Sequence, residues 1–421
     1  MNAVNPPSAL RDRELWISLL IAAPILLLPV SKSAELPVLI MAVFGFFLVI
    51  QKPIELFNTL GTKYFSLLFL MIWIPVTFSL PDAVNLGATA KVAWGHLRFF
   101  LAGLFIIHVM RHHKIAEYLS IILSVTLLFW VIDALIQYLA GNDLFAIPLN
   151  QDRLNGLFGE DLKLGQMTAV LSPILLLYFN RQSLLIKLPI WAGVIAVVLL
   201  SNSRASWVIL SIVLLGLFFH YALSNRKKAL IWFSSAVLAT ILISGILYSA
   251  SESFGKRVDQ TLLIFSDDPS DVDTALSMRL PIWQTALSMV EENPVNGVGA
   301  RNFRHAYSDY APDNDIFWDT LVTPTHPHQM LLEVGAETGM IGLVGLAIFL
   351  VLIARSLITS ASAGGLQTAA AICLFAAAFP INTHLAIYSS FWGMMLWWFT
   401  ALHCGTIQSA DNSAIQDPGT P

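Results

Sequence analysis

The sequence predicts an all-α polytopic membrane protein with about twelve transmembrane helices and one large helical loop. Of its 421 residues, 56% are hydrophobic and 12% are charged, whereas a soluble globular protein is about one quarter charged. Several runs exceed the ~18 nearly uncharged apolar residues that indicate a membrane span. One long hydrophilic stretch, residues 251–325, separates the last three spans from the others.

The first apolar run contains Pro24 and Pro29, and no small-residue cleavage site follows it, so we expect a retained helix. The spans are expected near residues 15–30, 34–50, 64–80, 96–110, 116–140, 164–180, 186–201, 204–222, 229–250, 329–354, 366–383 and 385–404. Nine transmembrane helices are expected in residues 1–250 and three in residues 326–404. Between them, residues 251–325 are expected to form a periplasmic loop with amphipathic helices, and residues 405–421 a disordered cytoplasmic tail.

Lysine and arginine set the expected orientation, because short cytoplasmic loops carry an excess of them. With the N-terminus inside, the inner short loops hold twelve of these residues and the outer short loops hold six. Both termini are therefore expected in the cytoplasm. The loop at 251–325, with twelve of the 27 acidic residues, is expected on the outer face, and the chemistry with it.

Composition excludes several classes of partner. The net charge of −4 argues against nucleic-acid binding, and Cys373 and Cys404 both lie in apolar segments, so no disulfide framework is expected. The stretches SDDPSDVD and PDNDIFWD are rich in aspartate, but neither has the spacing of an EF-hand. The His-Pro-His triplet at 326–328 lacks a third zinc ligand nearby. We expect no metal and no cofactor.

Three arginines and one aspartate require an explanation. Arg204, in SNSRASW, is expected in the first turn of a helix, where a cation opposes the helix dipole. It could be an interfacial arginine or a clamp for phosphate oxygens. Arg279 precedes an amphipathic helix that begins near Pro281, and Arg153 lies in QDRLNGLFG; each could equally be a solvated charge. Asp133, within a span, fits either a functional group or a polar contact between helices.

The stretch THPHQMLLEVGAETGMIG, residues 325–342, places a histidine at the start of a membrane helix. Because proline favours the first helical position, His326 is expected as the cap and His328 in the first turn. On a regular helix the glycines at 335, 339 and 342 then share the face of His328, and both glutamates point elsewhere. A helix N-terminus keeps histidine neutral and attracts anions, so His328 could act as a general base or merely cap the helix.

These motifs resemble a known family. His328-Gln329, followed after nine residues by GMIG at 339–342, resembles the H-[NSQ]-x9-G-x-x-G signature of bacterial O-antigen ligases. SNSRAS, SMRLPIWQTAL and NPVNGVGARNF resemble the same family, as does RLNGLFG, so the similarity extends from about Arg153 to the end of the tenth span. Two departures are Glu160–Lys163, where the family often has Pro-Asn, and Leu343-Val344, where it sometimes has Thr-Thr.

The resemblance implies a metal-independent membrane glycosyltransferase of lipopolysaccharide biosynthesis, with a GT-C-like fold. Such enzymes transfer O-antigen from undecaprenyl diphosphate to the lipid A-core oligosaccharide, at the periplasmic face of the bacterial inner membrane, with inversion. By matched motif, Arg204 and Arg279 would hold the diphosphate, with Arg153 as a third candidate. His328 would take the proton of the acceptor hydroxyl. The donor lipid, the acceptor glycolipid and membrane lipids are the partners so implied.

Three other functions remain open. An O-antigen polymerase shares the donor, but its arginine-containing loops carry a glycine at a spacing that neither Arg279 nor Arg153 shows. A protein O-oligosaccharyltransferase usually has a further domain after its last span. A lipid or polysaccharide transporter tends to show internal repeats and charges near the membrane midplane, whereas the charges here cluster at outer helix ends.

Overall fold

The computed structural model describes residues 12–150, 153–313, 315–317, 323–360, 363–381 and 386–416, and the regular elements within these ranges are all helices. The prediction of an all-α protein is therefore confirmed. Part of the aspartate-rich stretch PDNDIFWD, including Asp319, lies outside these ranges, as do residues 417–421 of the predicted tail.

Each predicted span coincides with a helix. In order, these helices are α1 (Arg13–Leu26), α2 (Glu35–Gln51), α4 (Leu60–Phe78), α5 (Leu86–Val109), α6 (His113–Ala140), α7 (Leu164–Tyr178), α8 (Leu184–Leu200), α9 (Arg204–Ser224), α10 (Arg226–Ala250), α15 (Met330–Ser360), α16 (Gly365–Ala378) and α17 (Ser390–Gln416). Within the described ranges, 7 helices are long and apolar enough to cross a membrane. The chain is thus a multi-pass membrane protein, and the count of twelve spans stays a prediction.

The tail predicted to be disordered from residue 405 is helical as far as Gln416, because α17 continues into it. The sequence offers a reason, since no proline follows Ser390 before Pro418 and small or unbranched residues predominate near the end.

Burial differs sharply between helices of the bundle. α7 is buried on every side from Leu164 to Leu176, and it packs against α6, α8, α9 and α16. A helix that is hydrophobic all round belongs in a core. α10 is the opposite case, because only 11% of its most apolar window is buried and side chains such as Ile241 and Ile246 are exposed. Exposed apolar side chains of this kind are those that face lipid.

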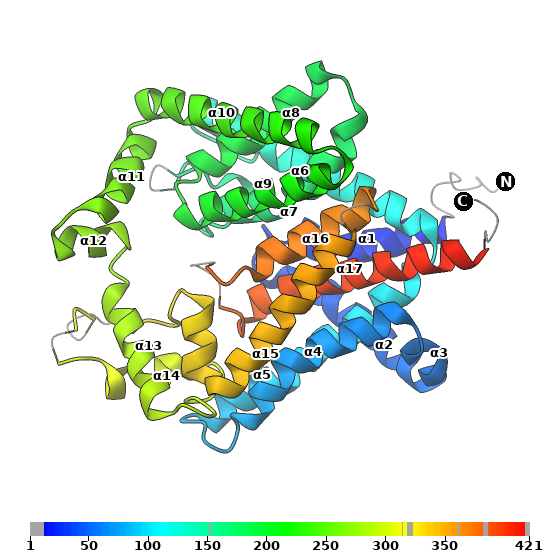
Figure 1. The fold of residues 1–421 in the computed structure, drawn as a ribbon, viewed down its shortest axis with the longest axis horizontal. Coiled ribbons are helices and arrows are strands. Elements are labelled where there is room, and N and C mark those ends of the chain that lie inside the picture. Colours follow the sequence, from blue (N-terminus) through cyan, green and yellow to red (C-terminus); the bar gives the residue numbers. More distant parts are fainter. Residues whose placement is uncertain are drawn as a thin grey trace, which may run out of the picture.

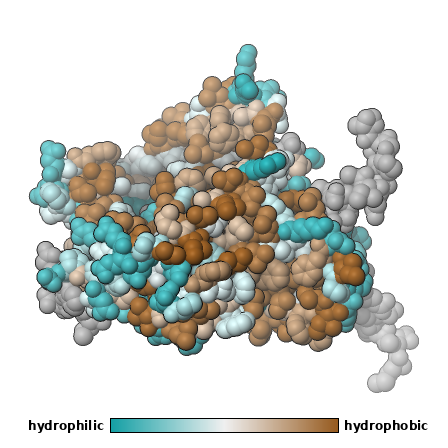
Figure 2. All heavy atoms as spheres, turned by 60° about the horizontal axis from the view of Figure 1, so that its bottom comes forward, coloured by the Kyte–Doolittle hydropathy of each residue, from teal (hydrophilic) through white to brown (hydrophobic). Residues whose placement is uncertain are grey.

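The long hydrophilic stretch folds into short helices at one end of the bundle. They are α11 (Glu252–Leu262), α12 (Pro269–Ala275), α13 (Leu280–Glu292) and α14 (Phe303–Tyr310). Figure 1 shows these helices on the left, whereas α1 begins and α17 ends on the right. In Figure 2, hydrophilic side chains gather at the end that carries α11–α14, and hydrophobic side chains cover much of the rest of this face.

α15 is interrupted at Gly339, whose φ of 61° and ψ of −158° are open essentially only to glycine. The interruption is filled by the backbone of NPVNGVG. The Met340 N–H donates to the Pro294 carbonyl at 2.8 Å, and the Val298 N–H donates to the Ala336 carbonyl at 2.9 Å. Backbone groups that the helix leaves unpaired are satisfied by the loop, which is thereby fixed against α15.

Candidate functional site

Four arginines line one cavity of about 730 Å³ at the end of the bundle that carries α11–α14. They are the three predicted residues, Arg153, Arg204 and Arg279, together with Arg257 on α11. They come from the loop before α7, the start of α9, α11 and the start of α13. Segments more than a hundred residues apart in the sequence therefore contribute positive charge to the same space.

Arg204 is the first residue of α9, as the prediction of a first-turn position requires, and Ser203 is the N-cap. The guanidinium points across to the loop before α13, where it donates to the carbonyl of Ala275 and, at 2.6 Å, to Ser277 Oγ. Its side chain therefore ties α9 to the segment that presents Arg279. A cation in the first turn is unfavourable by several tenths of a kcal/mol, and these contacts partly offset that.

Arg279 is the N-cap of α13, which begins at Leu280 with a proline in its first turn, as predicted. The two preceding residues, Ser277 and Met278, both have φ near 60°, at 59° and 58°. Left-handed conformations at two successive non-glycine residues are rare and cost about 1–3 kcal/mol each. Asp273 holds this turn, because its Oδ1 accepts from the Leu280 N–H at 3.0 Å. Such strain beside a charged cavity is typical of a functional site.

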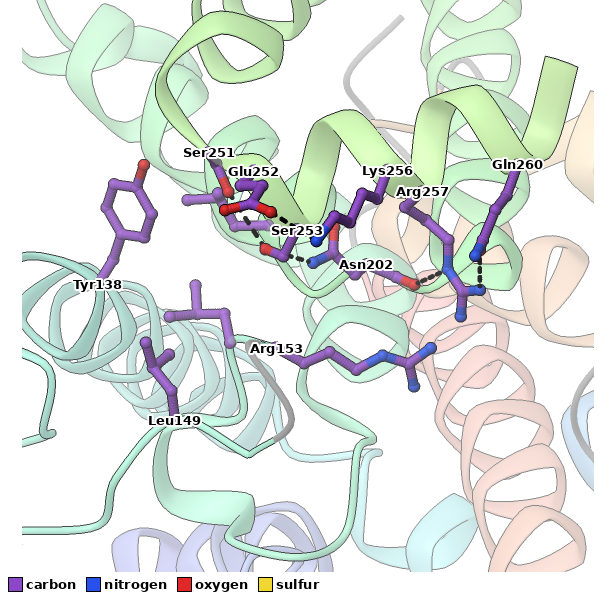
Figure 3. Close-up of a pocket in the computed structure, with 12 residues that line it drawn as sticks. Tyr138, Leu149, Arg153, Asn202, Ser251, Glu252, Ser253, Lys256, Arg257 and Gln260 are labelled. Atoms are coloured by element: carbon purple, nitrogen blue, oxygen red, sulfur yellow. Dashed lines mark hydrogen bonds and ion pairs between the residues drawn. The ribbon is translucent and has the colours of Figure 1, made fainter.

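Arg153 and Arg257 also line a neighbouring cavity of about 570 Å³, shown in Figure 3, so they form a wall shared by the two cavities. Arg257 Nε donates to the Asn202 carbonyl at 2.9 Å, and Nη1 donates to Gln260 Oε1 at 3.2 Å. Asn202, just before Arg204, has φ 51°. These contacts fix Arg257 against the turn that carries Arg204.

The clustered arginines repel one another and are partly buried, and both effects lower their pKa values. Burial, together with the charges of Arg153, Arg204 and Arg279, lowers the pKa of Arg257 to about 10. Burial, together with Arg204, lowers the pKa of Arg279 to about 10. Burial also lowers the pKa of Arg153. Cations that disfavour each other and are partly desolvated gain most from an anion placed among them. The cavity therefore suits a multiply charged anion such as a diphosphate.

The segment that carries His328 lies beside this cavity. Trp283, which lines the cavity, donates through Nε1 to the Pro327 carbonyl at 3.0 Å. His328 is not among the described residues that line the cavity itself. The rings of His326 and His328 lie with their centroids 3.9 Å apart.

The predicted start of the histidine helix was wrong. α15 begins at Met330, and Gln329 caps it, since its Oε1 accepts from the Leu332 N–H at 2.6 Å. His328 lies outside the helix with φ 54°. The physical reason is that the positive φ of His328 interrupts helical geometry there, and the Pro327 carbonyl, which would accept from the Leu331 N–H in the predicted helix, accepts from the Trp283 indole instead. The predicted alignment of three glycines beneath His328 fails with it, because Gly339 also breaks the helix.

Glu333 and Glu337 of α15 accept hydrogen bonds from the backbone of two neighbouring segments of the chain. Glu333 accepts from the backbone N–H of Ile387 at 3.0 Å, and Glu337 accepts from those of Arg301 at 2.6 Å and Phe303 at 3.1 Å. Both side chains are buried. Through these hydrogen bonds α15 organises the chain on both of its sides.

Asp133, left open between two roles, makes a structural contact. It is buried on α6, and its Oδ1 accepts from the Leu144 N–H at 3.0 Å. This bond holds the loop that follows α6, which leads to Arg153.

Residues 188–347 match a family model described as O-Antigen ligase. The matched segment runs from α8 into α15 and contains Arg204, Arg257, Arg279 and His328, whereas Arg153 lies before it. This segment, which is less than half of the chain, is similar to the O-antigen ligase family. No curated protein matches the chain.

Within the matched segment, Arg257 is the candidate site residue that the sequence patterns did not indicate. It follows Lys256, which pairs with Glu252 one helical turn earlier at 2.5 Å, a spacing typical of a solvated helix face. The spacing of this ion pair gives no sign that the next residue, Arg257, reaches the arginine cavity. Its one sequence signal is its place on the first amphipathic helix after α10, whose polar and apolar faces differ strongly.

Proposed function

We propose that this protein is an O-antigen ligase, which transfers O-antigen polysaccharide from undecaprenyl diphosphate to the lipid A-core oligosaccharide at the periplasmic face of the inner membrane. The observation that carries the proposal is the cavity of four arginines, three of them within the segment that matches the ligase family. The position of α11–α14, opposite the described ends of the chain, supports a periplasmic site with both termini in the cytoplasm.

In the proposed reaction, the diphosphate of the donor occupies the arginine cavity. The acceptor hydroxyl attacks the anomeric carbon from the face opposite the diphosphate, and His328 takes its proton. The bond between the anomeric carbon and the diphosphate oxygen breaks, so the product is inverted and undecaprenyl diphosphate leaves. Arg204 and Arg279 stabilise the charge that develops on the leaving oxygen, and Arg153 and Arg257 hold the remaining phosphate oxygens.

Guanidinium groups present planar donors that match phosphate oxygens in pairs. Four of them supply the positive charge that a divalent cation provides in other phosphate sites, so we propose a metal-independent reaction. Transfer by the purified protein should continue at an unchanged rate in excess EDTA.

The test in cells is a lipopolysaccharide gel from a strain in which the gene is deleted and then complemented. His328→Ala, Arg204→Ala and Arg279→Ala should each give a folded protein that does not join O-antigen to lipid A-core. His326→Ala is the matched control and should restore the ladder. Near-normal ligation by all three variants would show that the site is misassigned.

The same gel separates the other functions. Loss of the ladder with accumulation of lipid-linked polymer identifies a ligase. A single capped repeat identifies an O-antigen polymerase, and an unchanged ladder points to an oligosaccharyltransferase or a transporter.

A further inference from the structure

A second basic cavity, of about 510 Å³, lies on the α5 side of the molecule and shares none of its described lining residues with the arginine cavity. It is lined by α5 between Asn85 and Phe99, by the chain at 301–305, and by Tyr388 and Ser390 before and at the start of α17. The proposed diphosphate site does not use it, and of the motifs that resemble the ligase family only NPVNGVGARNF reaches it, through Arg301.

The cavity is strongly cationic. Its described lining includes Lys91, Arg98, Arg301 and Arg304 and no aspartate or glutamate, whereas the arginine cavity also contains Glu160 and Asp161. Four like charges around one space raise its affinity for anions of high charge density.

Two of these basic side chains, Arg98 and Arg304, have neighbours that bear on their charge. Arg98 donates to Ser390 Oγ at 3.2 Å, and its Cζ lies 4.6 Å from the Phe99 ring centroid. An ion pair with Glu35, at 3.7 Å, is partly exposed to solvent and is therefore weak. Burial and the nearby Arg301 lower the pKa of Arg304.

Each of the two cavities is connected to the histidine segment by one hydrogen bond. Arg304 Nη2 donates to the Thr325 carbonyl at 3.4 Å, and Trp283 Nε1 donates to the Pro327 carbonyl at 3.0 Å. Residues 325–327, immediately before His328, are thus held by one lining residue of each cavity.

The outer surface of α5 beside this cavity is apolar. Leu86 is 60% exposed and Trp94 is 68% exposed, and each adjoins a glycine that lines the cavity, Gly87 and Gly95. An exposed tryptophan beside basic residues is typical of the level at which lipid headgroups lie. A ligand with a phosphorylated head and an apolar body matches both surfaces.

We propose that this second cavity binds the phosphate groups of the glycolipid acceptor, through Lys91, Arg98, Arg301 and Arg304. The inference rests on the proposed ligase function, in which two lipid substrates must reach the same base from different sides. The donor diphosphate takes the arginine cavity, and the acceptor phosphates take the α5 cavity. A neutral sugar would gain little from four cations, whereas guanidinium and ammonium groups bind phosphate strongly.

The test measures dissociation constants of the purified full-length protein in neutral detergent. The probes are lipid A-core glycolipid, the same glycolipid after phosphatase treatment, and phosphatidylglycerol. Wild type should bind the phosphorylated glycolipid about tenfold or more tightly than the other two. Lys91→Gln/Arg304→Gln should lose that preference, and Lys227→Gln/Lys228→Gln, on the exposed start of α10, should retain it. Lys91→Gln alone removes an exposed charge, and should weaken binding even if the double variant unfolds.

Equal affinity of wild type and the double variant for the glycolipid overturns the proposal. So does phosphatidylglycerol binding as tightly as the glycolipid, which indicates a general lipid site, or binding that free inorganic phosphate abolishes at millimolar concentration. A protein that binds the phosphorylated glycolipid here but transfers nothing from the lipid diphosphate would contradict the ligase function and leave the site intact. Transfer that persists with an unchanged glycolipid KM in Lys91→Gln/Arg304→Gln would contradict the site and leave the function intact.

Discussion

Trp283 and Pro327, 44 positions apart, are joined by a hydrogen bond of 3.0 Å from the indole Nε1 to the backbone carbonyl. The bond ties α13, which begins next to Arg279, to the segment that ends at His328. It therefore couples the position of a proposed diphosphate-binding group to that of the proposed base. Trp283 is a positioning residue of the proposed site.

Trp283→Phe should lower kcat for transfer about tenfold, because it releases the Pro327 carbonyl while keeping an aromatic ring in place. The KM for the donor should change little. Trp398→Phe is the matched control, since the indole of Trp398 donates to the Ile21 carbonyl at 2.8 Å between α17 and α1. If both variants lose stability equally and neither loses kcat, the bond has no role in positioning.

Arg257→Ala should raise the KM for the lipid diphosphate donor about 10- to 100-fold, since it removes one charge-assisted contact. Steady-state kinetics with purified protein give this value directly. Lys256→Ala, one residue earlier on α11, removes an equal charge from outside the arginine cavity and should behave as wild type. An unchanged donor KM in Arg257→Ala would remove this residue from the proposed site.

Gly339→Ala should lower the free energy of unfolding by several kcal/mol, because a Cβ would lie 2.2 Å from the Val295 carbonyl oxygen and φ is 61°. Thermal unfolding of the detergent-solubilised protein measures the loss. Gly245→Ala in α10, where a Cβ meets nothing within 4 Å, should be neutral or slightly stabilising. Equal melting temperatures for the two variants would show that α15 is not constrained at Gly339.

Affinity for undecaprenyl diphosphate should be constant up to about pH 9 and then fall as the pH rises through about 10. The direction follows from the lowered pKa of Arg257 and Arg279, both about 10 instead of 12.5. Anion binding requires the protonated forms, so affinity is lost when the ligand-free groups lose their protons. Binding titrations at pH 8, 9.5 and 11 test this. In wild type, the affinity at pH 11 should be lower than at pH 8. Affinity that stays constant to pH 11 would contradict it.

Sequence patterns predicted the helices and several local features of the site. Each of the twelve predicted apolar runs coincides with a helix, and the preference of proline for the first turn located the start of α13, next to Arg279. These features depend on residues close together in the sequence. Periodicity and capping are local properties, which is why they can be found without a structure.

The features that were missed all depend on tertiary contacts. The start of α15 moved to Met330 because Trp283 takes the Pro327 carbonyl, a contact between distant segments. Arg257 faces the cavity only because α11 packs against the turn at Asn202. The α5 cavity joins residues more than 200 positions apart. None of these has a periodic signal.

The interruption at Gly339 makes two stretches of the chain interdependent. Residues 294–303 and 333–340 exchange backbone hydrogen bonds in both directions, and Glu337 adds two more from its side chain. A hybrid enzyme in which only one of these stretches came from a relative with a different backbone path there, or without Glu337, would leave buried donors and acceptors unmatched. Exchange of specificity between relatives through this region should therefore succeed only when both stretches are transplanted together.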